Sequence, residues 1–524
     1  MKKNSLMLWC VIFVITLIIF IPYINILSVA GKVTNFNLVE IKEAIYESTI
    51  TTGLVVLITF PLSLICAICV HFSNIRFKSF ACFTCLIPLF IPPISIGFGL
   101  LSILGKNGLI FSIFGLRLNF VGRFGVVVGH VLYTFPISFL LFLNSFRSLD
   151  MHIYENTLLL GIPFHKYLFG IVFPIIHKTV VAVFFQIIVM SISEYGVCLV
   201  VGGRIRTISL LVYRRVIGSL DFSAGLILGG ISFLPLLILS ICNVLSPNSS
   251  QGIIYKKTNS INANNKYLNA LAYIFLFVVM FYNSSLFISL IIMGFANNFP
   301  LDMSFTLDHF KQVLSAPYIY YFCNSLLIAF FSSIFGCLLS SVSAFFSIKG
   351  TQKTGRRLLY FISTLSYTIP GLLYGIGYLI TFKASFLRGT FMIMVLVNIA
   401  HFFASPFLLS FYSLSQFCPE VEDAMNLFNI KKHKRILDIY FPYMKSTLLD
   451  MFMYYFTNSM ITISAVVFLY TSRTMTYALV LGSFEGGLEY LSKSASITII
   501  IFLTNIFVLV CRKQLDKLLD KSPG

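Results

Sequence analysis

The sequence has little charge. Only 10% of its 524 residues are charged, whereas 58% are hydrophobic. Apolar runs repeatedly reach the ~20 residues that a helix needs to cross a bilayer. Backbone groups find no water inside the hydrocarbon, so each run must satisfy its own hydrogen bonds as a helix. This composition excludes a water-soluble globular fold, and we predict an all-α polytopic membrane protein.

Twelve transmembrane helices are predicted from these runs. The expected spans are 6–28, 47–71, 80–104, 124–146, 179–201, 222–245, 268–294, 322–347, 359–382, 389–412, 447–470 and 490–511. The first run could instead be a cleaved signal ending near Ala30. Signal cores run only about 7 to 15 residues, so we expect this helix to be retained.

Acidic residues are scarce, with 18 Asp and Glu against 37 Lys and Arg, which gives a net charge of +19. Nucleic-acid binding is one interpretation, but the basic residues flank the spans, which favours membrane topology and anionic lipid. With the N-terminus in the cytoplasm, 23 of the 37 basic residues face inward and 14 outward. This bias predicts a multi-pass plasma-membrane protein with a cytoplasmic N-terminus.

No catalytic constellation is found in the sequence. The nearest approach to a phosphate-binding loop, residues 99–107, has the wrong glycine spacing and no Ser or Thr after Lys106. Two C-x-x-C pairs, at residues 66–69 and 82–85, imitate zinc-ribbon spacing, but they lie in apolar helix ends without acidic or histidine support. We therefore predict no enzyme activity, no metal site and no cofactor bound by this chain.

A polar loop, by contrast, occurs twice. Each copy falls between the fourth and fifth spans of its half, and an acid precedes a proline by 19 residues both times (174 − 155 and 442 − 423). The first copy comprises Glu155, Asn156, Thr157, Gly161, Ile171 and Pro174. The second comprises Asp423, Ala424, Met425, Asn429, Ile439 and Pro442. Spacing kept this well indicates a docking surface.

Spans three and nine repeat each other as well. Proline and two glycines superpose, as Pro92, Gly97 and Gly99 in one copy and Pro370, Gly375 and Gly377 in the other. Such residues bend membrane helices and permit close approach of backbones. Two interpretations are open: these residues line a transport pathway, or they allow tight helix packing. We predict two parallel six-helix repeats around a pseudo-twofold axis. The units are 1–245, with a core from about 46, and 268–524, with a core of about 320–511, joined by a polar cytoplasmic linker, 246–267.

The repeated loop has the chemistry of a short capped helix. Its acid is favoured at the helix N-terminus, and Gly161 can stop the helix in a left-handed conformation before Pro163. Asn429 stands at the glycine position of the second copy, and asparagine is the next best residue at positive φ. Without a cytosolic partner, the apolar residues of such a helix would remain partly exposed.

This loop resembles the EAA loop of binding-protein-dependent ABC importer permeases. That pattern is Glu-Ala-Ala, three residues, Gly, nine residues, Ile, one residue, Leu-Pro. The chain keeps the glutamate, glycine, isoleucine and proline in its first copy, and the first alanine, isoleucine and proline in its second. The resemblance implies two fused type I permease units that bind two copies of a cytosolic ABC ATPase and an external solute-binding protein. ATP and Mg²⁺ would then lie on the ATPase.

Within that superfamily the chain looks like the bacterial inner-membrane branch that carries ferric iron, 2-aminoethylphosphonate and thiamine. The stretches 193–203, 213–218 and 462–470 are the most similar to it. The resemblance implies alternating access around a central site. The main alternative is an ion-coupled secondary transporter with two parallel six-helix repeats. Such transporters usually need several buried titratable groups for ion coupling, and one intramembrane acid and two histidines are few for this role.

The remaining polar candidates lie in or near the spans. Glu194, near the outer end of the fifth span, could contact substrate or pair with Arg204 or Arg206. For His130 and His401 an interhelical hydrogen bond is favoured over a ligand or proton role. The arginines of the following outer loop could contact a binding protein or an anionic solute, or be solvated; they are Arg204, Arg206, Arg214 and Arg215.

Overall fold

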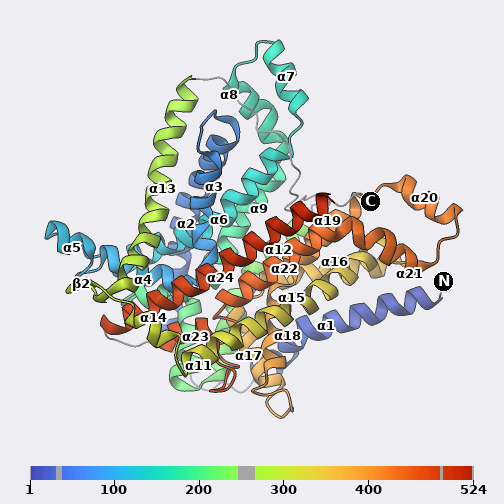
Figure 1. The fold of residues 1–524 in the computed structure, drawn as a ribbon. Coiled ribbons are helices and arrows are strands. Elements are labelled where there is room, and N and C mark those ends of the chain that lie inside the picture. Colours follow the sequence, from blue (N-terminus) through green and yellow to red (C-terminus); the bar gives the residue numbers. More distant parts are fainter. Residues whose placement is uncertain (1, 31–37, 246–265, 484–487, 522–524) are drawn as a thin grey trace. The chain divides into compact units, whose positions relative to one another are not determined.

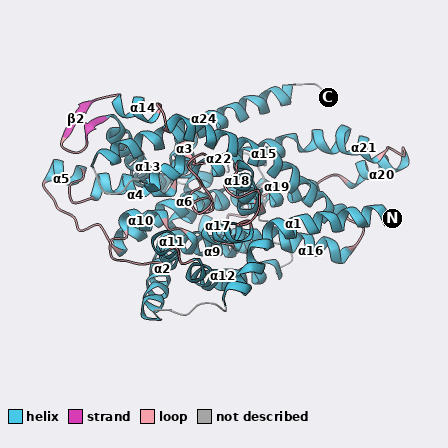
Figure 2. Ribbon diagram, turned by 90° about the horizontal axis from the view of Figure 1, so that it is seen from below, coloured by secondary structure: helices cyan, strands magenta, loops and turns pink. Residues whose placement is uncertain are grey.

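The computed structural model describes residues 2–30, 38–245, 266–483 and 488–521. Nearly all of this part of the chain is helical, and its only strands, β1 (Ala296–Asn298) and β2 (Asp302–Phe305), form one short antiparallel hairpin (Figure 2). The all-α class predicted from composition is therefore confirmed. Most of the predicted linker, 246–265, lies outside the described residues.

The chain divides into two compact units, and neither follows one half of the sequence. Unit 1 comprises residues 1–31, 321–476 and 503–524, and unit 2 comprises residues 32–320 and 477–502. The first helix of each half therefore packs with helices of the other half. In unit 1, Tyr378 donates a hydrogen bond to the backbone carbonyl of Ile18 at 2.8 Å. In unit 2, Ser289 donates to the carbonyl of Gly99 at 3.3 Å.

Unit 2 contains most elements of the first half. They are α2 (Leu38–Phe72), α3 (Lys78–Leu86), α4 (Pro93–Leu104), α5 (Leu109–Phe114), α6 (Arg123–Arg147), α7 (Met151–Leu159), α8 (Phe164–Tyr167), α9 (Phe173–Ser193), α10 (Gly196–Val201), α11 (Ile208–Ser219) and α12 (Phe222–Leu245). It adds α13 (Lys266–Phe295), the hairpin, α14 (Asp308–Val313), α23 (Tyr477–Ser483) and the first part of α24 (Leu488–Lys521).

Unit 1 contains α1 (Lys2–Ala30) and most elements of the second half. They are α15 (Tyr318–Lys349), α16 (Lys353–Leu365), α17 (Gly371–Thr381), α18 (Phe391–Phe402), α19 (Ala404–Ser415), α20 (Pro419–Leu427), α21 (Lys432–Lys434), α22 (Phe441–Ile461) and the end of α24. In Figure 1, α7 and α8 lie at one end of the helices of unit 2, and α20 and α21 lie at one end of the helices of unit 1.

Seven helices among the described residues are long and apolar enough to cross a membrane, and two bent helix pairs raise this number to nine. The twelve predicted spans therefore remain a prediction. Prolines explain part of the difference, because span 80–104 divides at Pro92 into α3 and α4, and span 359–382 divides at Pro370 into two helices bent by 108°. The pair α18 and α19 is bent by 57°.

Aromatic residues fill the core of unit 2 between α2, α3 and α6. Phe139, Phe142 and Phe146 recur along one face of α6 and are fully buried with Phe72. Phe60 and Phe142 meet edge to face with ring centroids 5.5 Å apart. In unit 1, Tyr455 of α22 is buried against Gly336 of α15 and shares a hydrogen bond of 2.8 Å with Ser340.

Candidate functional site

The first copy of the repeated loop begins with α7. The carboxylate of Asp150 accepts a hydrogen bond from the backbone N–H of His152 at 3.0 Å, which caps the helix N-terminus. Glu155 is exposed and lies 3.3 Å from Nδ1 of His152, a neighbour on the same face. Asn156 is exposed beside it, whereas Thr157 faces the interior.

Both helices end in the same way. Ile162 N–H donates to the carbonyl of Thr157 at 3.0 Å, and Ile430 N–H donates to the carbonyl of Met425 at 3.1 Å. These six-residue closures, each with a second bond from the preceding residue, are Schellman motifs. They need a left-handed residue, and Gly161 has φ +65° while Asn429 has φ +50°. The predicted left-handed stop is confirmed in both copies.

The two helices also bury and expose matching positions, 268 residues apart. Thr157 and Met425 are the buried members, at 5% and 2% exposure. The last residue of each helix is strongly exposed, with Leu159 at 86% and Leu427 at 83%. The capping residues that follow, Leu160 and Phe428, are 74% and 79% exposed. Each loop therefore presents two adjacent apolar side chains that nothing in its own unit covers.

A π-helical turn follows each loop. It spans Leu168–Val172 in the first copy and Arg435–Tyr440 in the second, so Ile171 and Ile439 lie in matching turns. Pro174 and Pro442 come second in the helices that follow, α9 and α22. Because proline has no N–H to donate four residues back, the backbone widens to longer-range bonding just before it.

The first loop is fastened by aromatic packing. Tyr154 of α7 meets Tyr167 of α8 with ring centroids 5.2 Å apart, and Tyr167 packs edge to face on Phe72 of α2 at 6.1 Å. Both tyrosines are buried. Packed rings therefore connect α7 to α8 and to α2.

Hydrogen bonds and charge fasten the second loop. Arg435 donates to the carbonyls of Ile430 at 2.6 Å and Met425 at 3.0 Å, and to the side-chain oxygen of Asn426 at 2.7 Å. Glu422, which stands 268 residues after Tyr154, pairs with Lys349 at the end of α15. It also accepts a hydrogen bond of 2.9 Å from the Tyr440 hydroxyl.

This difference predicts that the second loop has an acid-sensitive anchor that the first loop lacks. Burial raises the pKa of Glu422, but hydrogen bonds from Lys349 and Tyr440 outweigh it and leave the pKa below its ordinary value. A lowered folded-state pKa stabilises the fold above the unfolded pKa and loses that stabilisation as pH falls through the folded one. Hydrogen exchange of α20, corrected for intrinsic rates, should stay constant from pH 8 to about pH 5 and rise below about pH 4.

Two comparisons check this expectation. Glu422→Gln should speed exchange of α20 at pH 7 and remove the acid-dependent rise. The first loop has no anchor of this kind, because Tyr154 occupies the equivalent position in α7. A Glu422→Gln protein whose α20 exchanges as slowly as the wild type would contradict the assigned anchor.

One pair of the duplicated glycines, Gly97 and Gly375, is closely packed in both units. A Cβ on Gly97 would lie 2.7 Å from Cβ of Val200 in α10, and a Cβ on Gly375 would lie 3.1 Å from the ring of Phe468. Residues 200 and 468 are again 268 apart. Tight packing, one of the two interpretations of these glycines, is present within each unit. Pathway lining by Pro92, Gly97, Gly99, Pro370, Gly375 and Gly377 stays a prediction.

Alanine at Gly97 should therefore destabilise the protein. A Cβ at 2.7 Å from a branched carbon forces a backbone shift, and overpacking of this kind costs about 1–3 kcal/mol. Gly53 of α2 is the matched control, since a Cβ there would meet nothing within 4 Å. We expect Gly97→Ala to lower the melting temperature in detergent and Gly53→Ala to leave it unchanged or raise it. Equal melting temperatures for the two variants would refute the packing argument.

Glu194 occupies the break between α9 and α10. Its side-chain oxygen Oε1 accepts the backbone N–H of Gly196 at 2.5 Å, and its carbonyl accepts the Ser209 hydroxyl at 2.7 Å. The predicted alternative of a pair with Arg206 is wrong, because Arg206 contacts Glu40 at 2.9 Å. The bond from Gly196 forms between residues only two positions apart, so it needs no tertiary contact. Arg206 instead pairs with Glu40, which belongs to α2.

The other polar candidates are only partly as expected. His130 of α6 lies 3.2 Å from the Ser191 hydroxyl of α9, which confirms its interhelical hydrogen bond. Nδ1 of His401 has no hydrogen-bond partner among the described residues, and the ring packs on Tyr374, so the bond expected there is wrong for that nitrogen. Arg215 of α11 also pairs with Glu40, while Arg204 and Arg214 are exposed.

The four clustered cysteines are free thiols in apolar packing. Cys66 of α2 contacts Cys85 of α3, and both are fully buried in the core of unit 2. No group of three or more possible ligands that could hold a metal is found in the part of the chain that the structure describes.

Comparison with known proteins agrees with this geometry. The family described as "binding-protein-dependent transport system inner membrane component" matches residues 336–521. The chain is 23% identical over 422 residues to the ferric transport system permease protein FbpB of Actinobacillus pleuropneumoniae, covering 77% of this chain and 61% of the relative. It is 22% identical over 408 residues to the putative ferric transport system permease protein FbpB 1 of Haemophilus influenzae, covering 75% and 64%.

The chain thus spans less than two thirds of the length of these relatives. An alignment of 422 residues exceeds either half of this chain, so it includes parts of both halves. The matched region 336–521 contains the second loop, with its capped helix α20, its π-helical turn and Pro442. Residues 336–521 therefore match the family of binding-protein-dependent transport system inner membrane components.

Proposed function

We propose that this chain is the membrane permease of an ATP-driven importer, in which two cytosolic ATPase subunits each grip one copy of the repeated loop. The observation that supports this most strongly is the matched pair of loop ends. Both have a Schellman closure and two exposed apolar residues, although their sequences differ. Two surfaces of one shape suit two copies of one partner. ATP and Mg²⁺ would bind to the ATPase.

The way the loops are attached supports a proposal of alternating access. Each capped helix is joined through a π-helical turn to a long helix, α9 or α22, so closure of the ATPase would push on both. A rigid-body movement of the helices around a central site would then switch the pore from inward-open to outward-open. Solute would arrive on an external binding protein.

Ferric iron is the substrate that we propose first, with 2-aminoethylphosphonate and thiamine as the other candidates. The support is that both relatives carry the name of a ferric transport system. We also propose twelve spans in two parallel repeats, with the N-terminus and both loops in the cytoplasm. The bent pairs and the helices broken at proline would each supply one span.

Transport in proteoliposomes tests the proposal. The chain is reconstituted with a candidate ABC ATPase and a candidate binding protein, and uptake of radioactive ferric iron is compared with that of 2-aminoethylphosphonate. We expect iron uptake that requires ATP on the side of the membrane where the ATPase is bound, and that continues when a protonophore is added. Uptake that survives ATP depletion but stops with a protonophore would instead establish the ion-coupled secondary transporter.

A further inference from the structure

A groove lies between α2, α6 and α13 in unit 2, with a volume of about 570 Å³. Leu54, Ile58 and Leu62 form its wall on α2, and valines of α6 form the opposite wall. The α2 residues recur every fourth position, so they make one stripe about 12 Å long at 1.5 Å per residue. Ile58 is 41% exposed, so the groove opens to the outside of the unit.

The groove's surroundings are apolar except at one end. Both α2 and α6 are long and apolar enough to cross a membrane, so the medium that meets an exposed aliphatic stripe on them is lipid rather than water. Arg123, the first residue of α6, also lines the groove, and Phe124 beside it is 66% exposed. A cation and an aromatic ring at a helix end are typical of the membrane–water interface.

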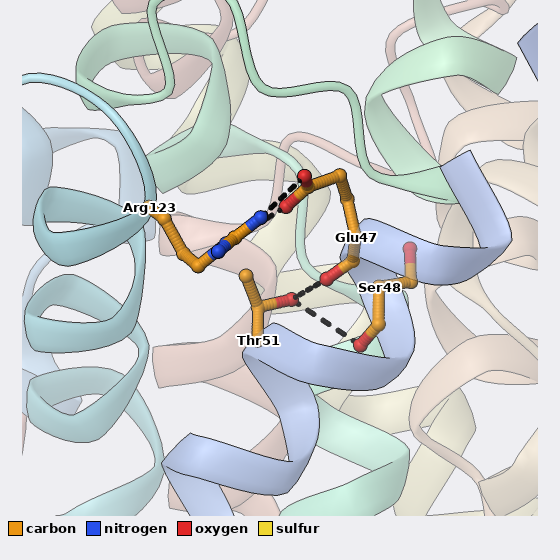
Figure 3. Close-up of polar contacts among 4 residues, drawn as sticks. All are labelled: Glu47, Ser48, Thr51 and Arg123. Carbon is orange, nitrogen blue, oxygen red and sulfur yellow. Dashed lines mark hydrogen bonds and ion pairs between the residues drawn. The ribbon is translucent and has the colours of Figure 1, made fainter. Parts of the chain in front are cut away.

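The guanidinium of Arg123 is held in place but keeps donors to spare. Its Nε lies 3.1 Å from one carboxylate oxygen of Glu47 and its Nη2 lies 2.6 Å from the other (Figure 3). The Thr51 hydroxyl donates to the carbonyl of Glu47 at 2.6 Å. The remaining nitrogen, Nη1, makes no hydrogen bond to the described residues, and the side chain is 43% exposed.

We propose that this groove binds one glycerophospholipid, with an acyl chain along the α2 stripe and the phosphate on Nη1 of Arg123. The aliphatic walls fit a hydrocarbon chain, and the groove's volume is that of a ligand site. A guanidinium donates to phosphate oxygens with the strength of a charge-assisted hydrogen bond. Glu47 fixes the guanidinium plane, so the phosphate meets an oriented donor. The site is independent of the proposed transport mechanism.

Native mass spectrometry of the detergent-purified full chain tests the site, with dioleoyl phosphatidylethanolamine as the probe. Ile58→Trp should fill the groove and weaken the tightest binding step about tenfold, which is 1.4 kcal/mol. Ile288→Trp is the matched control, because Ile288 of α13 is 53% exposed and does not line the groove. Equal lipid occupancy in the two variants would mean unspecific surface lipid and would overturn the proposal.

A second pair of variants tests the phosphate contact. Arg123→Gln should weaken phosphatidylethanolamine binding but leave dioleoylglycerol, which has the same chains and no phosphate, unchanged. Glu47→Gln keeps the cation and an amide oxygen that can accept from the guanidinium, so it should lose clearly less phospholipid binding than Arg123→Gln does. Equal losses in Arg123→Gln and Glu47→Gln would show that the pair only supports the fold, and would overturn the assignment of the phosphate.

Discussion

Replacing Gly161 with valine should reduce uptake at least about tenfold while the permease stays folded and its ATPase continues to hydrolyse ATP. Gly161 has φ +65°, and a β-branched residue avoids that conformation at a cost of about 1–2 kcal/mol or more. This cost is small beside a total stability of roughly 5–15 kcal/mol, so folding persists. The end of α7 would be redirected, however, and the exposed leucines with it. Uptake and ATP hydrolysis are measured in the same proteoliposomes.

Asparagine at the same position supplies the control. Asn429 adopts φ +50° at the equivalent place in the second loop, so Gly161→Asn should keep the Schellman closure and most of the uptake. A Cβ on Gly161 would meet nothing within 4 Å, so the two variants differ in backbone preference rather than in steric clash. Wild-type uptake in Gly161→Val would show that this turn does not transmit movement.

Placing aspartate at both Leu159 and Leu427 should separate the permease from its ATPase. These residues are 86% and 83% exposed in the chain alone, and burying a leucine stabilises a complex by about 1.5–3 kcal/mol. Losing two such contacts amounts to roughly 3–6 kcal/mol, or more than about a hundredfold in affinity. Co-purification of the ATPase with the tagged permease measures the loss.

Leu301 offers a matched control for charge on an exposed leucine. It lies in the turn between β1 and β2 and is 78% exposed. Leu301→Asp should leave ATPase association unchanged, since the proposed topology places this turn on the outer face. Single variants at Leu159 and Leu427 should each lose part of the association. If the double variant still associated fully with the ATPase, the loops would not be part of the ATPase interface.

The local structure of the two loops was predictable from the sequence. A Schellman closure involves six consecutive residues, so Gly161 or Asn429 at the end of a short helix is enough to indicate it. The break at Pro92 and Pro370 follows from a missing N–H in the same local way, and both prolines have φ −58°. The π-helical turns before Pro174 and Pro442 also have a local cause, and the same two prolines were the available signal.

The anchoring of the loops was not predictable, because it depends on residues far apart in the chain. The second loop is held by Lys349, 73 residues before Glu422 (422 − 349), while the first is held by Phe72 and two tyrosines. Likewise Arg206 was expected beside Glu194, its near neighbour, but α2 brings Glu40 to it from 166 positions away. The partner of a charged residue depends on which helices pack together, and the spacing of residues along the sequence does not predict this packing.

By itself the sequence determined the helical class, the apolar runs, the doubled loop and its capped ends. Each of these depends on hydrogen bonds or side chains within a few residues, and such interactions are formed by neighbours along the chain. Only the tertiary structure decided that α1 packs with helices of the second half and α13 with helices of the first. Helices that are apolar on most faces bury comparable surface against many neighbours, so their partners are selected by shape and small-residue contacts, which a hydrophobic pattern does not encode.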